Sequence, residues 1–259
     1  MQSVFKRYEK KYLISAEQHD VLRHAISPYM KPDKYGGYLV QNLYYDTEDW
    51  DVIRASVENP VFKEKLRIRC YGQPAPDSDL FLELKKKYDG IVYKRRLVIP
   101  GAVGAASQLT SISPYAPNIS CASYSGAIRK IVSYGDTQIA REIDYYLKTK
   151  AVTERIYISY KRTAYVGVDA AEGLRVTFDT DIRFRLHNLD FTSPAAGRII
   201  IPENMVLMEI KTPEAIPLWL ARIISRNKIY PSSFSKYGVC YAGHITKKSA
   251  ADRKETIIA

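Results

Sequence analysis

Charged and apolar side chains alternate along several short segments of the chain. In the stretch KEKLRIRCYG, residues 63–72, Lys65, Arg67 and Arg69 occupy every second position, and the residues between them are apolar. Because successive side chains of a β-strand point to opposite faces of a sheet, these three cations share one face. The pattern predicts an antiparallel sheet with one apolar face packed against helices and one charged face.

The same reasoning predicts secondary structure for most of the chain. Ser15, followed by Gln18 three residues later, is a capping-box pattern, which predicts a helix over 17–30. The Asp89–Gly90 pair is typical of a hairpin turn, and Gly36–Gly37 also indicates a turn. We expect further helices within 101–150, at 216–229 and at 235–245. We expect strands at 4–15, 37–47, 61–72, 79–90, 91–100, 151–168, 174–185 and 205–212.

These elements predict the fold class. Mostly antiparallel strands with a helical insert indicate an α+β fold, in which the sheet closes or nearly closes into an antiparallel β-barrel with flanking and inserted helices. The 259 residues are enough for a sizeable core. We expect a single domain over 1–259, with the helical insert at about 101–150.

Charges at every second position recur on nearly every predicted strand. On one strand such a pattern indicates a solvated outer face, but its recurrence favours a charged lumen inside a closed sheet. Unpaired charges in a dry lumen are costly, so the lumen must hold water and a polyanion. The positions outside 63–72 are Glu9 with Lys11, Glu83 with Lys85 and Lys87, Lys94 with Arg96, Arg162, Arg175 with Asp179, and Glu209 with Lys211.

The carboxylates among these cations have two open interpretations. A divalent cation that bridges phosphate oxygens needs hard oxygen ligands and takes one or two of them from protein, and Glu209 is our choice for that role. Salt bridging to the neighbouring cations is the alternative for Glu209, and equally for Glu9 and Glu83.

The composition agrees with a polyanionic partner. The chain has 39 Lys and Arg against 28 Asp and Glu, a formal net charge of +11. Nucleic acid is not the expected partner, because the basic residues follow strand phase and are mixed with glutamate. The three cysteines lack metal-ligand spacing, which argues against a zinc site and favours a reducing, cytoplasmic location. No segment resembles a signal peptide or a membrane span, so we expect any association with a membrane, at its inner face, to occur through a partner protein.

In order, the segments RYEKKY, KLRIRCYG, LELKKKY with YKRR, YKRTAY, LRVTFDTDI, LMEIKT and FSKYG resemble the VTC domain of polyphosphate polymerases. This family belongs to the triphosphate tunnel metalloenzymes, which are related to CYTH domains. The resemblance extends from about Phe5 to Gly238. It implies a basic tunnel in which the γ-phosphate of ATP passes to a growing inorganic polyphosphate chain, with Mn²⁺ or Mg²⁺ as cofactor.

The resemblance also implies roles for individual residues. Glu209 matches the metal-binding glutamate of the family. Ser235 lies beside Lys236 where the tunnel closes near the phosphates, and we assign it to substrate binding together with Glu9, Arg96 and Lys211. The residues that we assign to catalysis are Lys11, Arg67, Arg69, Lys85, Lys94, Arg162, Arg175 and Lys236.

One departure from the related hydrolases bears on the reaction. Hydrolytic CYTH members open with Glu-x-Glu-x-Lys, whereas Arg7 occupies the first of these positions here. Fewer carboxylates reduce the capacity for a second metal ion that could activate water. The departure favours the polymerase, and the alternatives are a tunnel triphosphatase and a non-catalytic module that binds polyphosphate or nucleotide.

Overall fold

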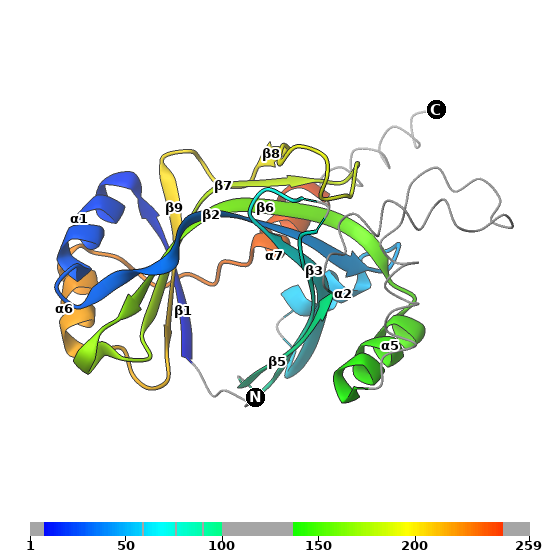
Figure 1. Ribbon diagram of the computed structural model, residues 1–259, viewed down its shortest axis with the longest axis horizontal. Coiled ribbons are helices and arrows are strands. Elements are labelled where there is room, and N and C mark those ends of the chain that lie inside the picture. The colour runs from blue at the N-terminus through cyan, green and yellow to red at the C-terminus, as the bar shows by residue number, and fades with distance from the viewer. Residues whose placement is uncertain (1–7, 59, 76, 90, 100–136, 246–259) are drawn as a thin grey trace, which may run out of the picture. The chain divides into compact units, whose positions relative to one another are not determined.

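The computed structural model describes residues 8–58, 60–75, 77–89, 91–99 and 137–245 (Figure 1). Its helices are α1 (Ala16–Ile26), α2 (Asp51–Val57), α5 (Gln138–Lys150), α6 (Leu218–Arg226) and α7 (Lys236–Cys240), with short helical turns at Asp169–Ala171 and Tyr241–Ile245. Its strands are β1 (Tyr8–Ser15), β2 (Met30–Asp46), β3 (Phe62–Tyr71), β4 (Leu80–Tyr88), β5 (Ile91–Ile99), β6 (Thr153–Gly167), β7 (Arg175–Arg185), β8 (Arg198–Ile199) and β9 (Met205–Thr212).

The predicted start of the first helix is confirmed. The Ser15 hydroxyl accepts a hydrogen bond from the backbone N–H of Gln18 at 3.1 Å, and the Gln18 side chain accepts one from the backbone N–H of Ser15 at 3.0 Å. The helix ends at Ile26 rather than at residue 30. Pro28 follows and has no N–H with which to continue the helical hydrogen bonds.

The turn predicted at Gly36–Gly37 is wrong. Both residues lie inside β2, which begins at Met30 rather than at residue 37. Gly36 has a φ of 62°, a left-handed conformation that glycine adopts without steric cost. Glycine within a strand marks an irregularity more often than an end, and the dipeptide pattern does not distinguish the two cases.

The sequence did not predict helix α2. The Asp46 carboxylate accepts hydrogen bonds from the backbone N–H groups of Val52 at 2.8 Å and Ile53 at 2.9 Å, and it thereby stabilises the first turn. Helix α5 confirms the helix predicted in the second half of the insert. The Thr137 hydroxyl caps its first turn by accepting a hydrogen bond from the backbone N–H of Ala140 at 3.2 Å. Residues 100–136 of the insert and 4–7 of the first predicted strand lie outside the described residues.

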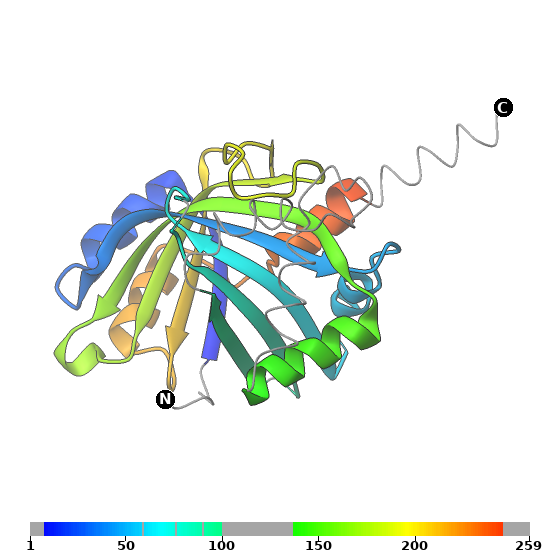
Figure 2. The same ribbon diagram turned by 45° about the vertical axis from the view of Figure 1, so that its right-hand side comes forward.

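The chain divides into two compact units. The first, unit 1, comprises the described residues of Val40–Ser159 and Arg185–Gly197. One face of β3, β4 and β5 is apolar and packs against α5, as the positions of the green helix and the teal strands show in Figure 2. Its core contains Leu66, Ile68, Leu82, Leu84, Ile143 and Leu147, all at most 1% exposed.

The second unit, unit 2, comprises the described residues of Phe5–Leu39, Tyr160–Phe184 and Arg198–Ala259. Helices α1 and α6 lie side by side and cover the apolar face of β1, β9 and β7 (Figures 1 and 2). This core contains Ile14, Leu22, Phe178, Met208, Ile210 and Leu220. The predicted arrangement of a dry face under helices and a charged face opposite is therefore confirmed within each unit.

Hydrogen bonding along the strands gives the order β1-β9-β7-β6-β2-β3-β4-β5, with β8 beside β7. The pairs β1–β9, β9–β7, β2–β3, β3–β4 and β4–β5 are antiparallel. The α+β class is confirmed. Within the described residues the order has two ends, β1 and β5, so the predicted closure into a barrel is not shown. None of the helices described is long and apolar enough to cross a membrane.

Candidate functional site

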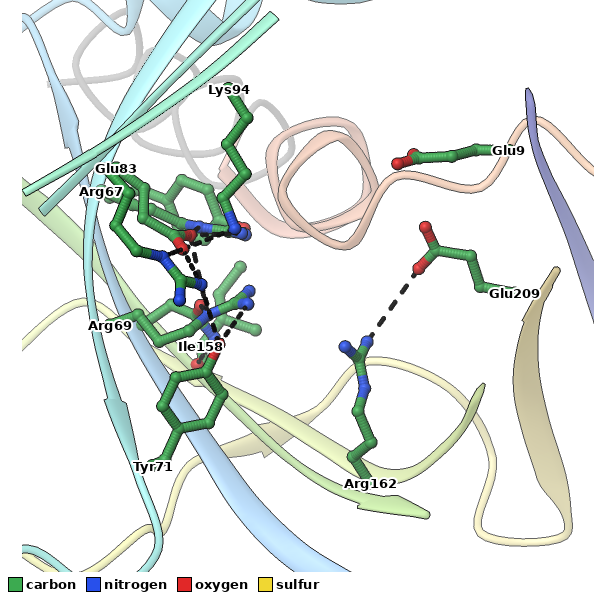
Figure 3. A network of polar contacts seen from close by, with 12 residues as sticks. Glu9, Arg67, Arg69, Tyr71, Glu83, Lys94, Ile158, Arg162 and Glu209 are labelled. Atoms are coloured by element: carbon green, nitrogen blue, oxygen red, sulfur yellow. Dashed lines mark hydrogen bonds and ion pairs between the residues drawn. The ribbon is translucent and has the colours of Figure 1, made fainter. Parts of the chain in front are cut away.

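In unit 1, four cations surround the carboxylate of Glu83. The register of the sheet places Arg67 opposite Glu83 and Glu83 opposite Arg96. Arg67 donates from Nε to Oε2 of Glu83 at 2.9 Å, Arg96 donates from Nε to Oε1 at 2.8 Å, and Lys94 Nζ lies 2.6 Å from Oε1. Arg69 Nε is 4.0 Å from Oε2. Figure 3 shows Arg67, Arg69 and Lys94 converging on Glu83, whose side chain is 1% exposed.

Aromatic and amide side chains fix the directions of the guanidinium groups. Arg67 donates to the hydroxyl of Tyr44 at 3.0 Å. The Tyr71 hydroxyl accepts hydrogen bonds from both Arg69 and Arg96 at 3.2 Å, and Arg69 Nε donates to the Asn42 side chain at 2.9 Å. Protein groups therefore hold the three arginines in place.

The charges of this network perturb one another. Burial raises the pKa of Glu83, but Arg67, Arg69 and Lys94 outweigh it and hold the pKa well below its usual range, so the carboxylate stays ionised. Burial, together with Arg67 and Arg96, lowers the pKa of Lys94 to about 7, although Glu83 opposes the change. Lys65, Lys85 and Lys94 also lie directly opposite one another across β3, β4 and β5. The predicted cations Arg67, Arg69, Lys85, Lys94 and Arg96 thus share one face of this unit.

In unit 2, strands β1 and β9 alternate cations and carboxylates. Lys11 lies opposite Glu209, and Glu9 lies opposite Lys211. The Lys211 ammonium is 3.4 Å from the Glu209 carboxylate and 3.9 Å from that of Glu9. Both carboxylates extend from their strands toward the same side (Figure 3). Burial raises the pKa of Glu209, but the nearby cations Lys211, Lys11, Arg162 and Lys236 lower it by more. The net pKa is below the usual range, so this carboxylate is also ionised.

Asp179 joins two of the predicted site residues. Its carboxylate accepts two hydrogen bonds from Arg162, at 2.6 and 2.8 Å, and one from Lys236 at 2.6 Å. The side chain of Asp179 is 1% exposed, and Arg162 also lies 4.0 Å from Glu209 (Figure 3). We noted Asp179 in the sequence as a charge in phase with Arg175 but assigned it no role. The separation of 57 residues between Asp179 and Lys236 hides their contact from any local pattern.

The remaining predicted residues of unit 2 make other contacts. Ser235 begins α7, where its hydroxyl accepts a hydrogen bond from the N–H of Gly238 at 3.2 Å. Lys11 donates to the backbone carbonyl of Phe234 at 3.2 Å, which ties β1 to the segment before α7. Arg175 donates to the carboxylate of Asp33 at 2.8 Å.

The carboxylates of unit 2 fit a metal ion that is shared with a phosphate ligand. Among the described residues, no group of three or more His, Cys, Asp and Glu side chains is arranged to hold a metal ion. Mg²⁺ is usually bound by one or two carboxylates together with phosphate oxygens and water. Glu209 is ionised and its nearest cations lie 3.4 and 4.0 Å away, so it offers one such carboxylate, whereas Asp179 accepts three hydrogen bonds of 2.6–2.8 Å from Arg162 and Lys236.

Comparisons with known proteins address the fold first and then the family. Among curated proteins, no sequence is significantly similar to the chain. Its structure resembles that of a candidate adenylyl cyclase from Hippeastrum with a dominant triphosphatase activity, with a TM-score of 0.53 and 21% identity over 92% of this chain and 96% of that one. A candidate adenylate cyclase from Vibrio parahaemolyticus gives a TM-score of 0.44 at 10% identity, over 91% of this chain and 98% of that one. A candidate adenylate cyclase from Bacillus halodurans gives a TM-score of 0.45 at 14% identity, over 90% of this chain and 96% of that one.

The similarity to the Hippeastrum protein shows that the two chains share a fold. The sequence model of the VTC domain matches residues 6–244, which include every predicted site residue. The resemblance inferred from the seven motifs is confirmed, and the chain belongs to the VTC domain family.

Proposed function

We propose that the protein is a metal-dependent polyphosphate polymerase that transfers the γ-phosphate of ATP to the end of an inorganic polyphosphate chain. The observation that carries the proposal is the network around Glu83. Arg67, Arg69 and Arg96 contribute three positive charges against the carboxylate of Glu83, and Lys94, whose pKa is about 7, adds a fourth when it is protonated, so positive charge is in excess in either state. Such a balance suits a polyanion, because guanidinium groups bind phosphate oxygens in pairs and an ammonium group binds them as a point charge.

The cations would act mainly by position and charge. Phosphoryl transfer asks little covalent chemistry of a protein, so cations held in place before the substrate arrives stabilise the transferred group without reorganising. In unit 2 we assign Lys11, Arg162, Arg175, Lys211, Lys236 and Ser235 to phosphate binding, and in unit 1 we add Lys85. Glu209 would hold the Mn²⁺ or Mg²⁺ ion, which would supply positive charge to phosphate oxygens as a Lewis acid, and Glu9, on the adjacent strand, stays assigned to substrate binding. The closed tunnel predicted from the sequence remains part of the proposal.

Transfer to phosphate is favoured over transfer to water by the residues present. The end of a polyphosphate chain is already anionic, so the attacking oxygen needs no general base. Within the part of the chain that the structure describes, no histidine is among the residues of the Glu83 network or among those named above that contact Asp179 and Glu209. Hydrolysis of the same triphosphate is the second candidate, because the Hippeastrum protein, which is similar in fold, has a dominant triphosphatase activity.

The test is an assay for the product. The purified chain is incubated with ATP and Mn²⁺, and the products are separated on a gel that resolves polyphosphate from orthophosphate. We expect a long polymer. Orthophosphate alone would make the protein a triphosphatase, and an absence of turnover would support the binding module.

Variants test the site assignment. We expect Arg67→Ala and Glu209→Gln to lose the polymer while their unfolding midpoints show an intact fold. Lys10→Ala is the control, because Lys10 is exposed and points to the opposite face of β1 from Lys11. Full activity in both site variants would refute the assignment. The cytoplasmic location and the membrane partner stay predictions.

A further inference from the structure

The hydroxyl group of Thr177, on β7, is buried and has no hydrogen-bond partner among the residues that the structure describes. Thr177 as a whole is 0% exposed. Its neighbours Val176 and Phe178 lie in the apolar core of unit 2, so Thr177 points to the charged face. A buried hydroxyl without a partner destabilises a fold, and buried polar groups in native proteins are almost always hydrogen-bonded. This hydroxyl therefore requires an explanation beyond packing.

Thr177 lies beside the carboxylate that we assign to the metal ion. The register of β7 and β9 places Thr177 directly opposite Glu209. Residues in such a pair have Cβ atoms about 4.5–5.5 Å apart, a separation that a hydroxyl and a carboxylate can bridge with a hydrogen bond. Strand β7 also lies between β9 and β6, so the 4.0 Å ion pair of Glu209 with Arg162 extends across β7. The Thr177 hydroxyl is thus buried within reach of the Glu209 side chain.

The Glu209 carboxylate has room for a further hydrogen bond. A carboxylate can accept at about four lone-pair positions on its two oxygens. The contacts of Glu209 are ion pairs with Lys211 at 3.4 Å and with Arg162 at 4.0 Å, both longer than a charge-assisted hydrogen bond. Asp179 differs, because it accepts three hydrogen bonds of 2.6–2.8 Å. No short contact of this kind fixes the orientation of the Glu209 carboxylate within the described residues.

We propose that Thr177 is a positioning residue for the divalent cation. When Glu209 ligates the ion through one carboxylate oxygen, the Thr177 hydroxyl donates a hydrogen bond to the other and holds the carboxylate in its ligating orientation. Carboxylates that ligate metal ions are usually held by hydrogen bonds in this way. The inference rests on the proposed function for the assignment of the ion to Glu209. It extends that function, because the motifs gave Thr177 no role.

Two other partners for the hydroxyl predict different results. A phosphate oxygen of the substrate would make Thr177 a phosphate-binding residue, and its effect would not require the metal ion. A buried water molecule would make the hydroxyl part of the fold, so that its removal would lower stability and change no binding constant. The position of Thr177 opposite a glutamate, rather than opposite a cation, favours the carboxylate.

Valine and serine variants separate these possibilities. Thr177→Val keeps the shape of the side chain and removes the hydroxyl, Thr177→Ala does the same with a smaller side chain, and Thr177→Ser keeps the hydroxyl. Thr212→Val is the matched control, because Thr212 is also buried but donates to the backbone carbonyl of Ala215 at 3.4 Å. In EDTA, Thr177→Val should unfold at the same urea concentration as the wild type or a higher one, since it breaks no hydrogen bond. Thr212→Val should unfold at a lower one.

The experiment measures the binding of tripolyphosphate to the full chain by calorimetry, in Mn²⁺ and in EDTA. We expect Mn²⁺ to strengthen binding to the wild type. Thr177→Val should weaken binding in Mn²⁺ about tenfold, the lower end of what hydrogen-bond partners of metal ligands contribute, and leave binding in EDTA unchanged. Thr177→Ser and Thr212→Val should bind as the wild type does. In a Glu209→Gln protein, Thr177→Val should have no further effect, because both residues act through one ion.

Each alternative has its own result. Equal weakening in Mn²⁺ and in EDTA would identify phosphate as the partner, and lower stability with unchanged binding would make the role structural; either overturns the inference. No strengthening of wild-type binding by Mn²⁺, or a tenfold effect of Thr177→Val that persists in Glu209→Gln, would also overturn it.

The synthesis assay separates this inference from the proposed function. Polymer made from ATP by the wild type, together with unchanged binding in Mn²⁺ by Thr177→Val, would leave the function and refute the inference. The expected binding pattern without any synthesis would support the positioning role and refute the polymerase.

Discussion

Replacing Asp179 by Asn removes the buried negative charge that joins β6 and β7 to helix α7. The carboxylate of Asp179 accepts hydrogen bonds from Arg162 and Lys236 and is almost fully buried. An asparagine keeps the size of the side chain and one carbonyl oxygen, but it removes the charge that pairs with Lys236 and Arg162 and leaves Arg162 with Glu209 at 4.0 Å. The variant therefore tests whether this charge, rather than packing, holds the network together.

The expected cost follows from the burial of the three groups. The side chains of Asp179, Arg162 and Lys236 are 1%, 10% and 12% exposed. Removal of one partner from a buried ion pair costs about 3–5 kcal/mol. One kcal/mol shifts the unfolding midpoint of a chain of this size by about 2–4 °C, so we expect the midpoint to fall by about 6–20 °C.

The pH dependence of the effect has a definite sign. Burial raises the pKa of Asp179, but Lys236 and Arg162 lower it further, so the folded-state pKa lies below the unfolded value of about 3.9. Stability that comes from such a group is present above the unfolded pKa and is lost as the pH falls through the folded pKa. The difference between the wild type and Asp179→Asn should therefore be constant near pH 7 and shrink in acid.

The measurement is denaturant unfolding at several pH values, with Asp181→Asn as the control. Asp181 lies two residues along the same strand, its side chain is 31% exposed, and it pairs with Arg183 and Lys161. Its replacement should cost about 0.2–1 kcal/mol. Tripolyphosphate should stabilise Asp179→Asn more than the wild type, because phosphate can replace the lost carboxylate as a partner. Equal costs for the two variants, or a cost of Asp179→Asn that does not shrink in acid, would refute the reasoning.

The remaining predictions concern the two units and one helix cap. Because the pKa of Lys94 is about 7, the affinity for tripolyphosphate, measured by titration calorimetry, should fall as the pH rises above 7. Lys94→Arg should abolish this pH dependence. Glu83→Gln should move it to lower pH, because Glu83 raises the pKa of Lys94. Lys11→Ala should raise KM for ATP in steady-state assays, whereas Lys10→Ala, on the opposite face of the same strand, should not. Ser15→Ala should destabilise the chain by about 1 kcal/mol in urea unfolding, since it removes the capping box of α1; no change would mean that the cap is dispensable.

The sequence predicted the strands and their charged faces because period-two alternation is a local signal. Lys65, Arg67 and Arg69 require no knowledge of a neighbour to be placed on one face. The capping box at Ser15 is equally local, and it was predicted to the residue. The same limitation explains the error at Gly36–Gly37, where the local pattern is that of a turn but both residues lie inside β2.

The partners within each network could not be predicted, because they depend on register and on distant segments. Arg67 is paired with Glu83, rather than with another acidic residue, because the β3–β4 pairing sets these two opposite each other. Asp179 contacts Lys236 only because α7 packs near β7 in the folded chain. Nothing in the segment LRVTFDT indicates the contact between these two side chains. Ser235 shows both situations. Its hydrogen bond with the N–H of Gly238 caps α7 and can be predicted from neighbouring residues, whereas a contact with phosphate depends on where the ligand binds.

The charges of the two units differ in a way that bears on how a polyphosphate chain could be handled. In unit 1, the buried carboxylate of Glu83 fixes Arg67 and Arg96, and within the described network the cations outnumber it. On the charged face of unit 2, glutamates lie opposite the lysines of β1 and β9, and Asp179 holds Arg162 and Lys236. The first surface suits an anion that carries no metal ion, such as an acceptor chain, and the second suits phosphates bridged by a divalent cation, such as those of a nucleotide. Glu209→Gln should therefore abolish the effect of Mn²⁺ on ATP binding and leave polyphosphate binding in EDTA unchanged. A loss of both in that variant would mean that the two faces do not act separately.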